Sequence, residues 1–264
     1  MLTKNFLLST AFLGIIACGQ GPHSPQAESE LKIYGGNKVN AQDEIARYTV
    51  VLLQNNRPVC TGVLVAPRLV LTAAHCYYLS NPSQGMTIGF GLKAQDTDQI
   101  PVARFVPHEG FDMKAGQAGG TETVVNDISL IELSADAPDG YTPVAIMGKD
   151  EALRPQEKVV LAGYGKTDVS TGLFGWGKVL GELYKVETGV VLESAASKEV
   201  WLGTTPGKSA CNGDSGGPAL VKRENGMKLL GLTSRGRDCK SEVIYTDVRY
   251  FRDWIEAKGG LAAE

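Results

Sequence analysis

The chain has 264 residues, 43% of them apolar, which is enough for one large all-β domain or two small ones. The formal net charge is −3, and no basic stripe with interleaved aromatic residues occurs, so nucleic-acid binding is not indicated. Helical periodicity is scarce, whereas 32 glycines, 12 prolines and many short Val, Ile, Leu and Thr runs are typical of an all-β protein.

The first segment has the features of a secretory signal. Lys4 supplies a positive charge, and the apolar run 6–17 is too short to span a bilayer. The run ends at Cys18 in a pattern that resembles the bacterial lipoprotein box, in which the cysteine is acylated and becomes the new N-terminus. The alternative is a plain signal with a chance cysteine. Residues 18–32 are then interpreted as a tether or propeptide, because they are rich in Pro, Ser, Gln and Glu.

From Tyr48 onward, short apolar runs alternate with turns in two series, separated by the polar stretch 148–157. The first series contains 49–53, 61–65, 69–72, 86–90, 102–106 and 128–133. The second contains 159–162, 180–186, 228–233 and 243–246. The restart predicts two β modules, at about 33–150 and about 151–248, and strands of this length and spacing fit barrels or sandwiches.

Two other segments carry weaker signals. Apolar and aromatic side chains recur at helical spacing near the C-terminus and predict a helix at about 249–258, ended by Gly259 and Gly260. The Gly-rich segment 115–120 lacks the Lys-Ser/Thr of a phosphate-binding loop and is interpreted as a flexible insertion.

Cysteine usage supports the division at Cys18, because five cysteines are an odd number for an exported protein. Removal of Cys18 to lipid leaves four thiols, which suggests two disulfides in an oxidising compartment: Cys60, Cys76, Cys211 and Cys239. Three pairings are possible from the sequence alone. A cytosolic metal site is not indicated, since no Cys-x-x-Cys spacing occurs, and we expect neither a metal nor a cofactor.

The segment 213–218, Gly-Asp-Ser-Gly-Gly-Pro, places one serine among residues that allow a tight turn. Such a turn exposes the hydroxyl of Ser215 and aims neighbouring N–H groups at one point, as an oxyanion hole requires. A serine hydroxyl is a poor nucleophile until a base takes its proton, so the chain must also supply a histidine oriented by a carboxylate.

The chain has three histidines. His23 lies in the tether and His108 in a polar turn, whereas His75 ends an apolar run and is therefore the candidate base. Asp127 opens an apolar strand and is the candidate carboxylate, which makes the chain order His, Asp, Ser.

The segments 72–76 (TAAHC), 126–128 (NDI) and 213–218 (GDSGGP) resemble the three signature motifs of the trypsin-like serine proteases, in the family's order. The resemblance extends from Ile33 to the C-terminus. It implies two packed six-stranded antiparallel β-barrels with a C-terminal α-helix, and a serine endopeptidase that acts on protein or peptide substrates. By the same resemblance Ser215 is the nucleophile, His75 the general base and acid, and Asp127 the residue that orients the imidazole.

The resemblance also assigns supporting groups. The N–H groups of Gly213 and Ser215 would hold the oxyanion, and the family pattern pairs Cys60 with Cys76 and Cys211 with Cys239. Other disulfides common in animal members are missing, which fits a bacterial secreted protein or lipoprotein and leaves stability more dependent on core packing.

The segment 33–36 (IYGG) resembles the activation site of the family and follows Lys32, a trypsin-like cleavage point. The resemblance implies a zymogen, in which cleavage frees the Ile33 amine to form a buried ion pair with Asp214. Tyr34 replaces the usual valine. Because the cut would separate the enzyme from Cys18, we hypothesise that activation releases it from the membrane.

The resemblance assigns the specificity pocket to Ser209, Ala210, Ser234, Gly236 and Val243. Ser209 stands where enzymes that prefer Lys or Arg carry an Asp, Arg235 replaces a tryptophan of the pocket wall, and Val243 aligns with a position that is usually glycine. We therefore expect a small or medium apolar residue at the cleavage site. In the alternative alignment, Glu242 faces the pocket and favours basic residues. If Lys is rejected, a separate activating protease is needed.

Two other functions are compatible with these motifs. One is a catalytically inactive protease-like binding module on the same fold. The other is a hydrolase of small esters, which is disfavoured because such enzymes carry Gly-x-Ser-x-Gly in the order Ser, Asp, His. For the whole protein we expect an exported monomer whose only membrane contact is the lipid anchor before activation.

Acidic pairs near Asp96 and Asp98 are interpreted as solvated loop charges rather than a calcium site.

Overall fold

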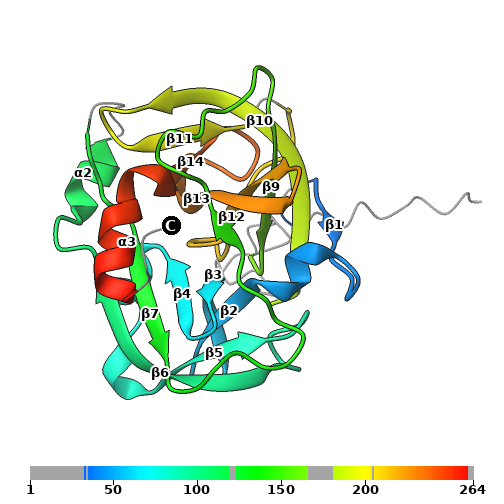
Figure 1. The fold of residues 1–264 in the computed structure, drawn as a ribbon, viewed down its shortest axis with the longest axis vertical. Coiled ribbons are helices and arrows are strands. Elements are labelled where there is room, and N and C mark those ends of the chain that lie inside the picture. The colour runs from blue at the N-terminus through cyan, green and yellow to red at the C-terminus, as the bar shows by residue number, and fades with distance from the viewer. Residues whose placement is uncertain (1–32, 34, 119–122, 166–180, 204, 261–264) are drawn as a thin grey trace, which may run out of the picture.

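The computed structural model describes residues 33, 35–118, 123–165, 181–203 and 205–260. Most of this part of the chain folds as β-strands, with a helix at its C-terminal end (Figure 1). The strands are β1 (Asn37–Lys38), β2 (Thr49–Gln54), β3 (Arg57–Ala66), β4 (Leu69–Thr72), β5 (Met86–Phe90), β6 (Asp98–Pro107), β7 (Ser129–Leu133), β8 (Ala145–Ile146), β9 (Lys158–Gly163), β10 (Tyr184–Ser194), β11 (Glu199–Leu202), β12 (Pro218–Arg223), β13 (Gly226–Gly236) and β14 (Val243–Asp247). The helices are α1 (Ala74–Leu79), α2 (Met113–Ala118) and α3 (Arg252–Gly259), with 3-10 turns at Glu44–Arg47, Pro82–Gln84 and Val248–Phe251.

The first six long strands close into an antiparallel barrel in the order β2-β3-β4-β7-β6-β5. Strands β2 and β4 are buried along almost their whole length, which explains their continuous Val and Leu runs. Strand β6 is largely exposed and carries polar residues between its apolar ones. The barrel interior is therefore filled by β-branched and leucine side chains that the alternating sequence pattern supplies.

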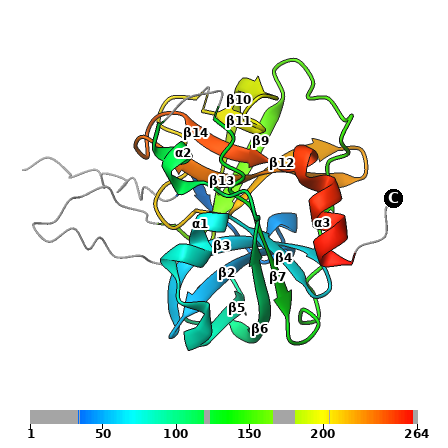
Figure 2. The same ribbon diagram turned by 90° about the vertical axis from the view of Figure 1, so that its left-hand side faces the viewer.

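A second six-stranded barrel runs in the order β9-β10-β11-β14-β13-β12 and is closed by the pairings of β9 with both β10 and β12. It has its own core cluster, built around Val159, Leu161, Val200 and Tyr245. Figure 2 shows the two barrels stacked one above the other with α1 between them. The predicted fold, two six-stranded antiparallel barrels with a C-terminal helix, is confirmed.

Two short strands do not follow the predicted division of the chain into modules at about residue 150. Strand β1 pairs with β10, and β8 pairs with β13 in parallel, so both add to the second barrel although they precede it in sequence. The physical reason is that β10 and β13 extend beyond the residues that pair with β11 and β14. Backbone groups at 184–185 and 228–229 are therefore left unpaired on one side, and β1 and β8 satisfy them. The connecting segments thus join the barrels rather than belonging to the first.

The C-terminal helix lies against both barrels (Figures 1 and 2). Predicted at about 249–258, it consists of a 3-10 turn followed by α3, which ends at Gly260 in the left-handed conformation with φ of 64°. Ile255 is buried in the core of the first barrel, and Arg104 of β6 donates to the carbonyl oxygen of Lys258 at 3.0 Å. The helix therefore returns the chain end to the first barrel.

Of the Gly-rich segment, residues 115–118 form the end of α2, and residues 119–120 lie outside the described part of the chain. Asp112 begins this helix by accepting hydrogen bonds from the backbone N–H groups of Lys114 and Ala115, and these bonds satisfy amides of its first turn. None of the helices in the described ranges is both long and apolar enough to span a bilayer.

Candidate active site

The three residues proposed as a triad come from three separate elements. His75 lies in the first turn of α1, Asp127 just precedes β7, and Ser215 lies in the turn before β12. The first two belong to the first barrel and the serine to the second, so the site forms where the barrels meet.

His75 and Asp127 are joined at two points. The Nδ1 atom of His75 lies 2.8 Å from Oδ2 of Asp127, and the backbone N–H of His75 donates to Oδ1 at 2.9 Å. These two bonds hold both the position and the plane of the imidazole. With Nδ1–H donating to the carboxylate, the other ring nitrogen is left as an acceptor, which is the tautomer that a general base needs.

The carboxylate of Asp127 is only 3% exposed and is kept ionised by its neighbours. Burial by itself would raise its pKa, but the attraction of His75 and hydrogen bonds from His75 and Ser234 hold the pKa below the ordinary value. The Ser234 hydroxyl donates to Oδ2 at 2.7 Å, and the Thr246 hydroxyl donates to the Asp127 carbonyl oxygen at 2.9 Å. Residues of the second barrel thus fix a carboxylate of the first.

The turn that carries Ser215 is bound to both barrels. The Ser215 carbonyl oxygen accepts from the N–H of Thr61 in β3 at 2.9 Å, and the N–H of Gly216 donates to Thr233 in β13 at 2.8 Å. Gly216 has φ of 76°, and a Cβ there would overlap the Thr72 hydroxyl and lie 2.7 Å from the backbone nitrogen of Ala73. The glycine after the serine is therefore required by both its conformation and the closeness of the first barrel.

The predicted oxyanion hole has suitable free donors. Within the described residues, the N–H groups of Gly213 and Ser215 make no hydrogen bond to protein acceptors. The Gly213 carbonyl oxygen accepts from the Thr61 hydroxyl at 3.0 Å, which fixes the orientation of this peptide. The hydroxyl of Ser215 makes no hydrogen bond to His75 in the part of the chain that is described, and such catalytic hydrogen bonds commonly tighten only when substrate binds.

Asp214 is completely buried and lines neither of the two cavities described below. Its carboxylate accepts from the N–H groups of Gly165 at 2.9 Å and Cys211 at 2.8 Å, and a Cβ on Gly165 would lie 2.6 Å from it. Burial raises its pKa to about 7, although the two amide hydrogen bonds act in the opposite direction. Among the described residues no cation pairs with it.

Ile33, the residue predicted to follow the activation cut, is 1% exposed and packs in the core of the second barrel. Lys32, Tyr34 and the predicted signal, lipidation site and tether lie outside the described residues.

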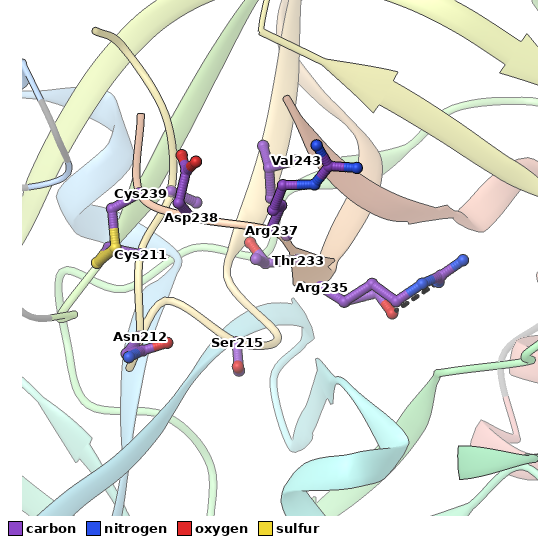
Figure 3. A pocket seen from close by; sticks show the side chains of 12 residues that line it. Cys211, Asn212, Ser215, Thr233, Arg235, Arg237, Asp238, Cys239 and Val243 are labelled. Carbon is purple, nitrogen blue, oxygen red and sulfur yellow. Dashed lines mark hydrogen bonds between the residues drawn. A yellow bond between two sulfur atoms is a disulfide. The ribbon is translucent and has the colours of Figure 1, made fainter. Parts of the chain in front are cut away.

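A cavity of about 340 Å³ opens beside Ser215 (Figure 3). Four of the five predicted pocket residues line it, namely Ala210, Ser234, Gly236 and Val243. Ser209 does not, because it is fully buried and its hydroxyl donates to the carbonyl oxygen of Ala210 at 3.3 Å. Glu242 is exposed and is not part of the lining, so the alternative in which it faces this cavity is not observed.

The cavity wall also contains charges that the sequence analysis did not place there. Arg237 and Asp238 line it together with Arg235, and Figure 3 shows the Cys211–Cys239 disulfide on the opposite side from Arg237 and Val243. Asp238 uses its carboxylate to accept from the N–H groups of Lys240 and Ser241, both at 2.8 Å. The only sequence signal for these residues was their position directly after the Ser-Arg-Gly of the pocket wall.

A second cavity of about 270 Å³ lies beside the imidazole and was not predicted. Its lining is mainly apolar and comprises His75, Leu79, Phe111, Met113, Val125, Asp127, Ser234 and Arg235. Ser234 and Arg235 line both cavities. The arrangement offers an apolar side chain a place next to the base while another side chain enters the cavity beside the serine.

The structure contains both disulfides that the family resemblance implied, Cys60–Cys76 and Cys211–Cys239. The donor atoms of Cys60, His75 and Cys76 lie within 4.8 Å of one another, as ligands of a metal would. However, the two sulfurs are bonded to each other and are not available as thiolates, which leaves His75 as a single ligand.

Two antiparallel six-stranded barrels with a His–Asp pair and a serine turn at their junction define the chymotrypsin-like class of proteins. Comparison with known proteins agrees. The family model described as Trypsin matches residues 33–255, and this chain belongs to that family of serine proteases. The solved structure of neuropsin, a serine protease expressed in the limbic system of mouse brain, has the same fold with a TM-score of 0.69, at 24% identity over 85% of this chain and 98% of that one.

Curated relatives include Kallikrein-4 of Homo sapiens, 30% identical over 79% of this chain and 81% of that protein. Trypsin of Phaedon cochleariae is 25% identical over 95% of this chain and 96% of that protein. Serine protease 56 of Homo sapiens is 28% identical over 79% of this chain, but the match spans only 36% of that longer protein.

Proposed function

We propose that this protein is an active serine endopeptidase whose triad is Ser215, His75 and Asp127. The observation that carries the proposal is the two-point clamp of His75 on a buried, ionised Asp127 at the junction that also holds the serine turn. A histidine with only a structural role would not need a buried carboxylate bonded to both its ring and its backbone N–H. Nor would it need the two free N–H groups of Gly213 and Ser215 on the other side of the cleft.

The reaction follows from these positions. The Ser215 hydroxyl oxygen attacks the carbonyl carbon of the scissile peptide while its proton passes to the free ring nitrogen of His75. The negative charge on the former carbonyl oxygen is held by the N–H groups of Gly213 and Ser215. When the C–N bond breaks, the leaving amine takes the proton from His75, and water then hydrolyses the acyl-enzyme by the same steps in reverse.

We propose a preference for small or medium apolar residues on the acyl side of the cut bond. Val243 lines the cavity beside the serine and takes up space there, and Ser209, at the position where the family's Lys- or Arg-preferring enzymes carry an Asp, is buried outside the lining. Arg237 in the wall adds a repulsive element against Lys and Arg, whereas the charge of Arg235 is paired with Glu199. The carboxylate of Asp238 in the same wall accepts from the backbone N–H groups of Lys240 and Ser241. Profiling with a peptide library tests this, and preferential cleavage after Lys or Arg would contradict it.

We also propose that the protein is made as a zymogen. Cleavage after Lys32 would free the Ile33 amine to pair with Asp214, whose buried carboxyl has no cation among the described residues. Because Lys is a poor fit to the proposed pocket, a separate protease is required for this cut. Purified precursor kept alone should not generate an N-terminus at Ile33, and self-conversion at a concentration-dependent rate would contradict the requirement.

The proposal for export concerns residues 1–32, outside the described part of the chain. We propose a bacterial lipoprotein precursor anchored through Cys18 and released as a secreted monomer by the cut at Lys32. Mass spectrometry of the membrane fraction should find acylated Cys18 only in the precursor. Retention of the cleaved enzyme in the membrane would refute the release.

The first experiment is labelling with a serine-directed fluorophosphonate, applied to the precursor and to protein that begins at Ile33, with Ser215→Ala as control. Labelling of the cleaved form alone is expected, and it would support both the nucleophile and the zymogen. If neither folded form is labelled, the proposal is wrong and the catalytically inactive binding module replaces it.

A further inference from the structure

The residue that replaces the family's tryptophan, Arg235, carries a buried ion pair. Its guanidinium binds the carboxylate of Glu199 in two places, Nη1 to Oε1 at 2.5 Å and Nη2 to Oε2 at 3.1 Å. The Glu199 side chain is 3% exposed and that of Arg235 is 18% exposed. The two residues come from β13 and β11, which lie on either side of β14.

The guanidinium is linked to the triad through one hydroxyl. Nη1 of Arg235 donates to the Ser234 hydroxyl oxygen at 3.4 Å, and that hydroxyl gives its own hydrogen to Oδ2 of Asp127 at 2.7 Å. The same Oδ2 faces Nδ1 of His75 at 2.8 Å. A continuous line of contacts therefore runs from Glu199 to the imidazole.

A β-bulge makes this line possible. Residues of a regular strand alternate between faces, but the pairing of β13 with β14 skips Ser234, since Thr233 lies opposite Tyr245 and Arg235 opposite Ile244. Ser234 and Arg235 consequently both line the cleft although they are consecutive. Glu199 lines neither cavity and lies behind the guanidinium, so the positive end of the pair is turned toward Asp127.

Stability does not explain the pair. A buried ion pair commonly contributes no more than well-packed apolar residues would, because both charges lose their hydration. The Nε atom of Arg235 is in addition buried without a hydrogen-bond partner among the described residues, which is a cost that an aromatic residue would avoid.

We propose that Arg235, fixed by Glu199, is a positioning residue that sets the pH at which the triad becomes competent, by placing a cation behind Asp127 through Ser234. The inference rests on the proposed peptidase activity and deepens it. A cation at this place favours ionised Asp127 and opposes a second positive charge on the imidazole, so the general base stays unprotonated to lower pH.

The electrostatic surroundings stay the same in every variant considered below. The titratable or charged side chains on β14, between the two strands, are Tyr245 and Asp247. Those on other neighbouring segments are Tyr77, Tyr78, His108, Asp112, Lys198, Arg237 and Asp238. Because none of these side chains is changed, a difference in pH profile between the variants is due to the Arg235–Glu199 pair.

The test uses two charge-removing substitutions, alone and combined, and one substitution that keeps the charge. In Glu199→Gln the cation loses its counter-charge, so the acidic limb of the kcat/KM profile should move to lower pH by roughly half a unit. In Arg235→Gln the cation is gone, so the limb should move to higher pH by a similar amount. The double variant, which leaves no unpaired buried charge, should lie between them, and Arg235→Lys should stay near the wild type.

A matched control is the exposed pair Lys158–Glu187 of the same barrel, whose side chains are 75% and 50% exposed. Neutralising each of these residues to Gln should leave the acidic limb in place, because solvent screens their charges. Opposite shifts in the cleft variants and none in the control support the proposal. If the cleft variants have a lower kcat and their acidic limbs move in the same direction, or do not move, the pair is only structural.

A second readout does not depend on activity. The imidazole of His75 can be followed by nitrogen NMR during a pH titration of the Ser215→Ala protein, and only two other histidines have to be distinguished. The titration midpoint of the His75 imidazole should move to lower pH in Glu199→Gln and to higher pH in Arg235→Gln. If the wild-type protein hydrolyses no peptide but the midpoints still shift, the peptidase proposal fails and the proposed role of Arg235 stands. If the protein is active and the midpoints do not move, the peptidase proposal stands and the proposed role of Arg235 fails.

Discussion

At the scale of single residues, the site depends on how the second barrel completes a pair made in the first. The Asp127 carboxylate receives hydrogen bonds from His75 on its own side and from Ser234 on the other, while Thr246 binds the Asp127 backbone carbonyl oxygen. The carboxylate would be a costly buried charge without these donors. We therefore propose that Asp127 selects the imidazole tautomer of His75 as well as balancing the charge on that ring.

Asp127→Asn tests that role. An asparagine can present its NH₂ group to Nδ1, which then becomes the acceptor and leaves the other ring nitrogen protonated and unable to act as a base. We expect kcat to fall by about 10⁴-fold, the loss that the same change causes in a related triad, with little change in the fold. Hydrolysis rates measure the loss of kcat, and circular dichroism measures any change in the fold. A loss below about tenfold would contradict the assigned role.

Asp214 leads to a prediction about pH. Its pKa rises from an ordinary 3.8 to about 7 in the folded, uncut chain, so the folded state holds the proton more tightly than the unfolded state does. This group therefore makes the free energy of unfolding decrease as pH rises from about 4 to about 7. We expect the melting temperature of the Ser215→Ala precursor to fall between pH 5 and pH 8.

The matched control is the same Ser215→Ala protein cleaved to begin at Ile33. Its new ammonium group would favour ionised Asp214 and remove the decrease. Identical pH dependence in the two forms would count against the proposed ion pair.

At the scale of elements, the proposed catalytic histidine is held by the start of a very short helix. Helix α1 spans Ala74–Leu79 and has no side-chain cap, so its own hydrogen bonds contribute little. The Cys60–Cys76 disulfide instead ties its first turn to β3, and the Cys76 sulfur lies 3.8 Å from the carbonyl oxygen of Ser215. The bond thus braces the base next to the nucleophile.

Replacing Cys60 and Cys76 together by Ala should lower the free energy of unfolding by about 3 kcal/mol, since the bond closes a sequence separation of 16 residues. Activity should fall as well, because α1 loses its brace. Urea denaturation and hydrolysis rates measure both effects. The Cys211–Cys239 double variant, with a separation of 28 residues, is the comparison and should lose slightly more stability. Unchanged activity in the first variant would show that α1 does not need the disulfide.

At the scale of the whole molecule, the cleft exists only while the two barrels keep their relative position. Tyr164 follows β9 of the second barrel, is 1% exposed, and donates to the carbonyl oxygens of Gly91 at 2.6 Å and Thr49 at 3.2 Å. The Thr61 hydroxyl accepts from the N–H of Tyr164 at 3.1 Å and donates to Gly213. This connection reaches from the barrel interface to the oxyanion turn.

Tyr164→Phe leaves both carbonyl oxygens without this donor while keeping the packing of the ring. We expect the free energy of unfolding to fall by about 1–2 kcal/mol, still in one cooperative transition. Thermal and urea unfolding measure it. Tyr250→Phe is the control, because that side chain is 45% exposed and should have almost no effect. Two separate transitions in Tyr164→Phe would mean that the barrels unfold independently.

Strands whose runs are apolar throughout could be predicted closely from the sequence. The ranges 69–72 and 86–90 coincide with β4 and β5, since continuous burial leaves a continuous apolar signal. Strand β11 was missed because it begins with Glu199, whose charge argues against a buried strand. Its partner Arg235 lies 36 residues further along the chain, and no local pattern reveals such a pairing.

The sequence by itself left three pairings of the four cysteines open, and only the family resemblance implied the observed one. The candidate triad residues could be named from the sequence by itself, because each motif records a local requirement of its own turn. Gly216 is an example, since only glycine fits so close to the first barrel. The charged cavity wall, the exclusion of Ser209 from it and the line from Glu199 to His75 were decided by the tertiary structure alone. The physical reason is that these features arise from side chains brought together across the β-bulge of β13 and between two barrels, where sequence distance no longer predicts spatial distance.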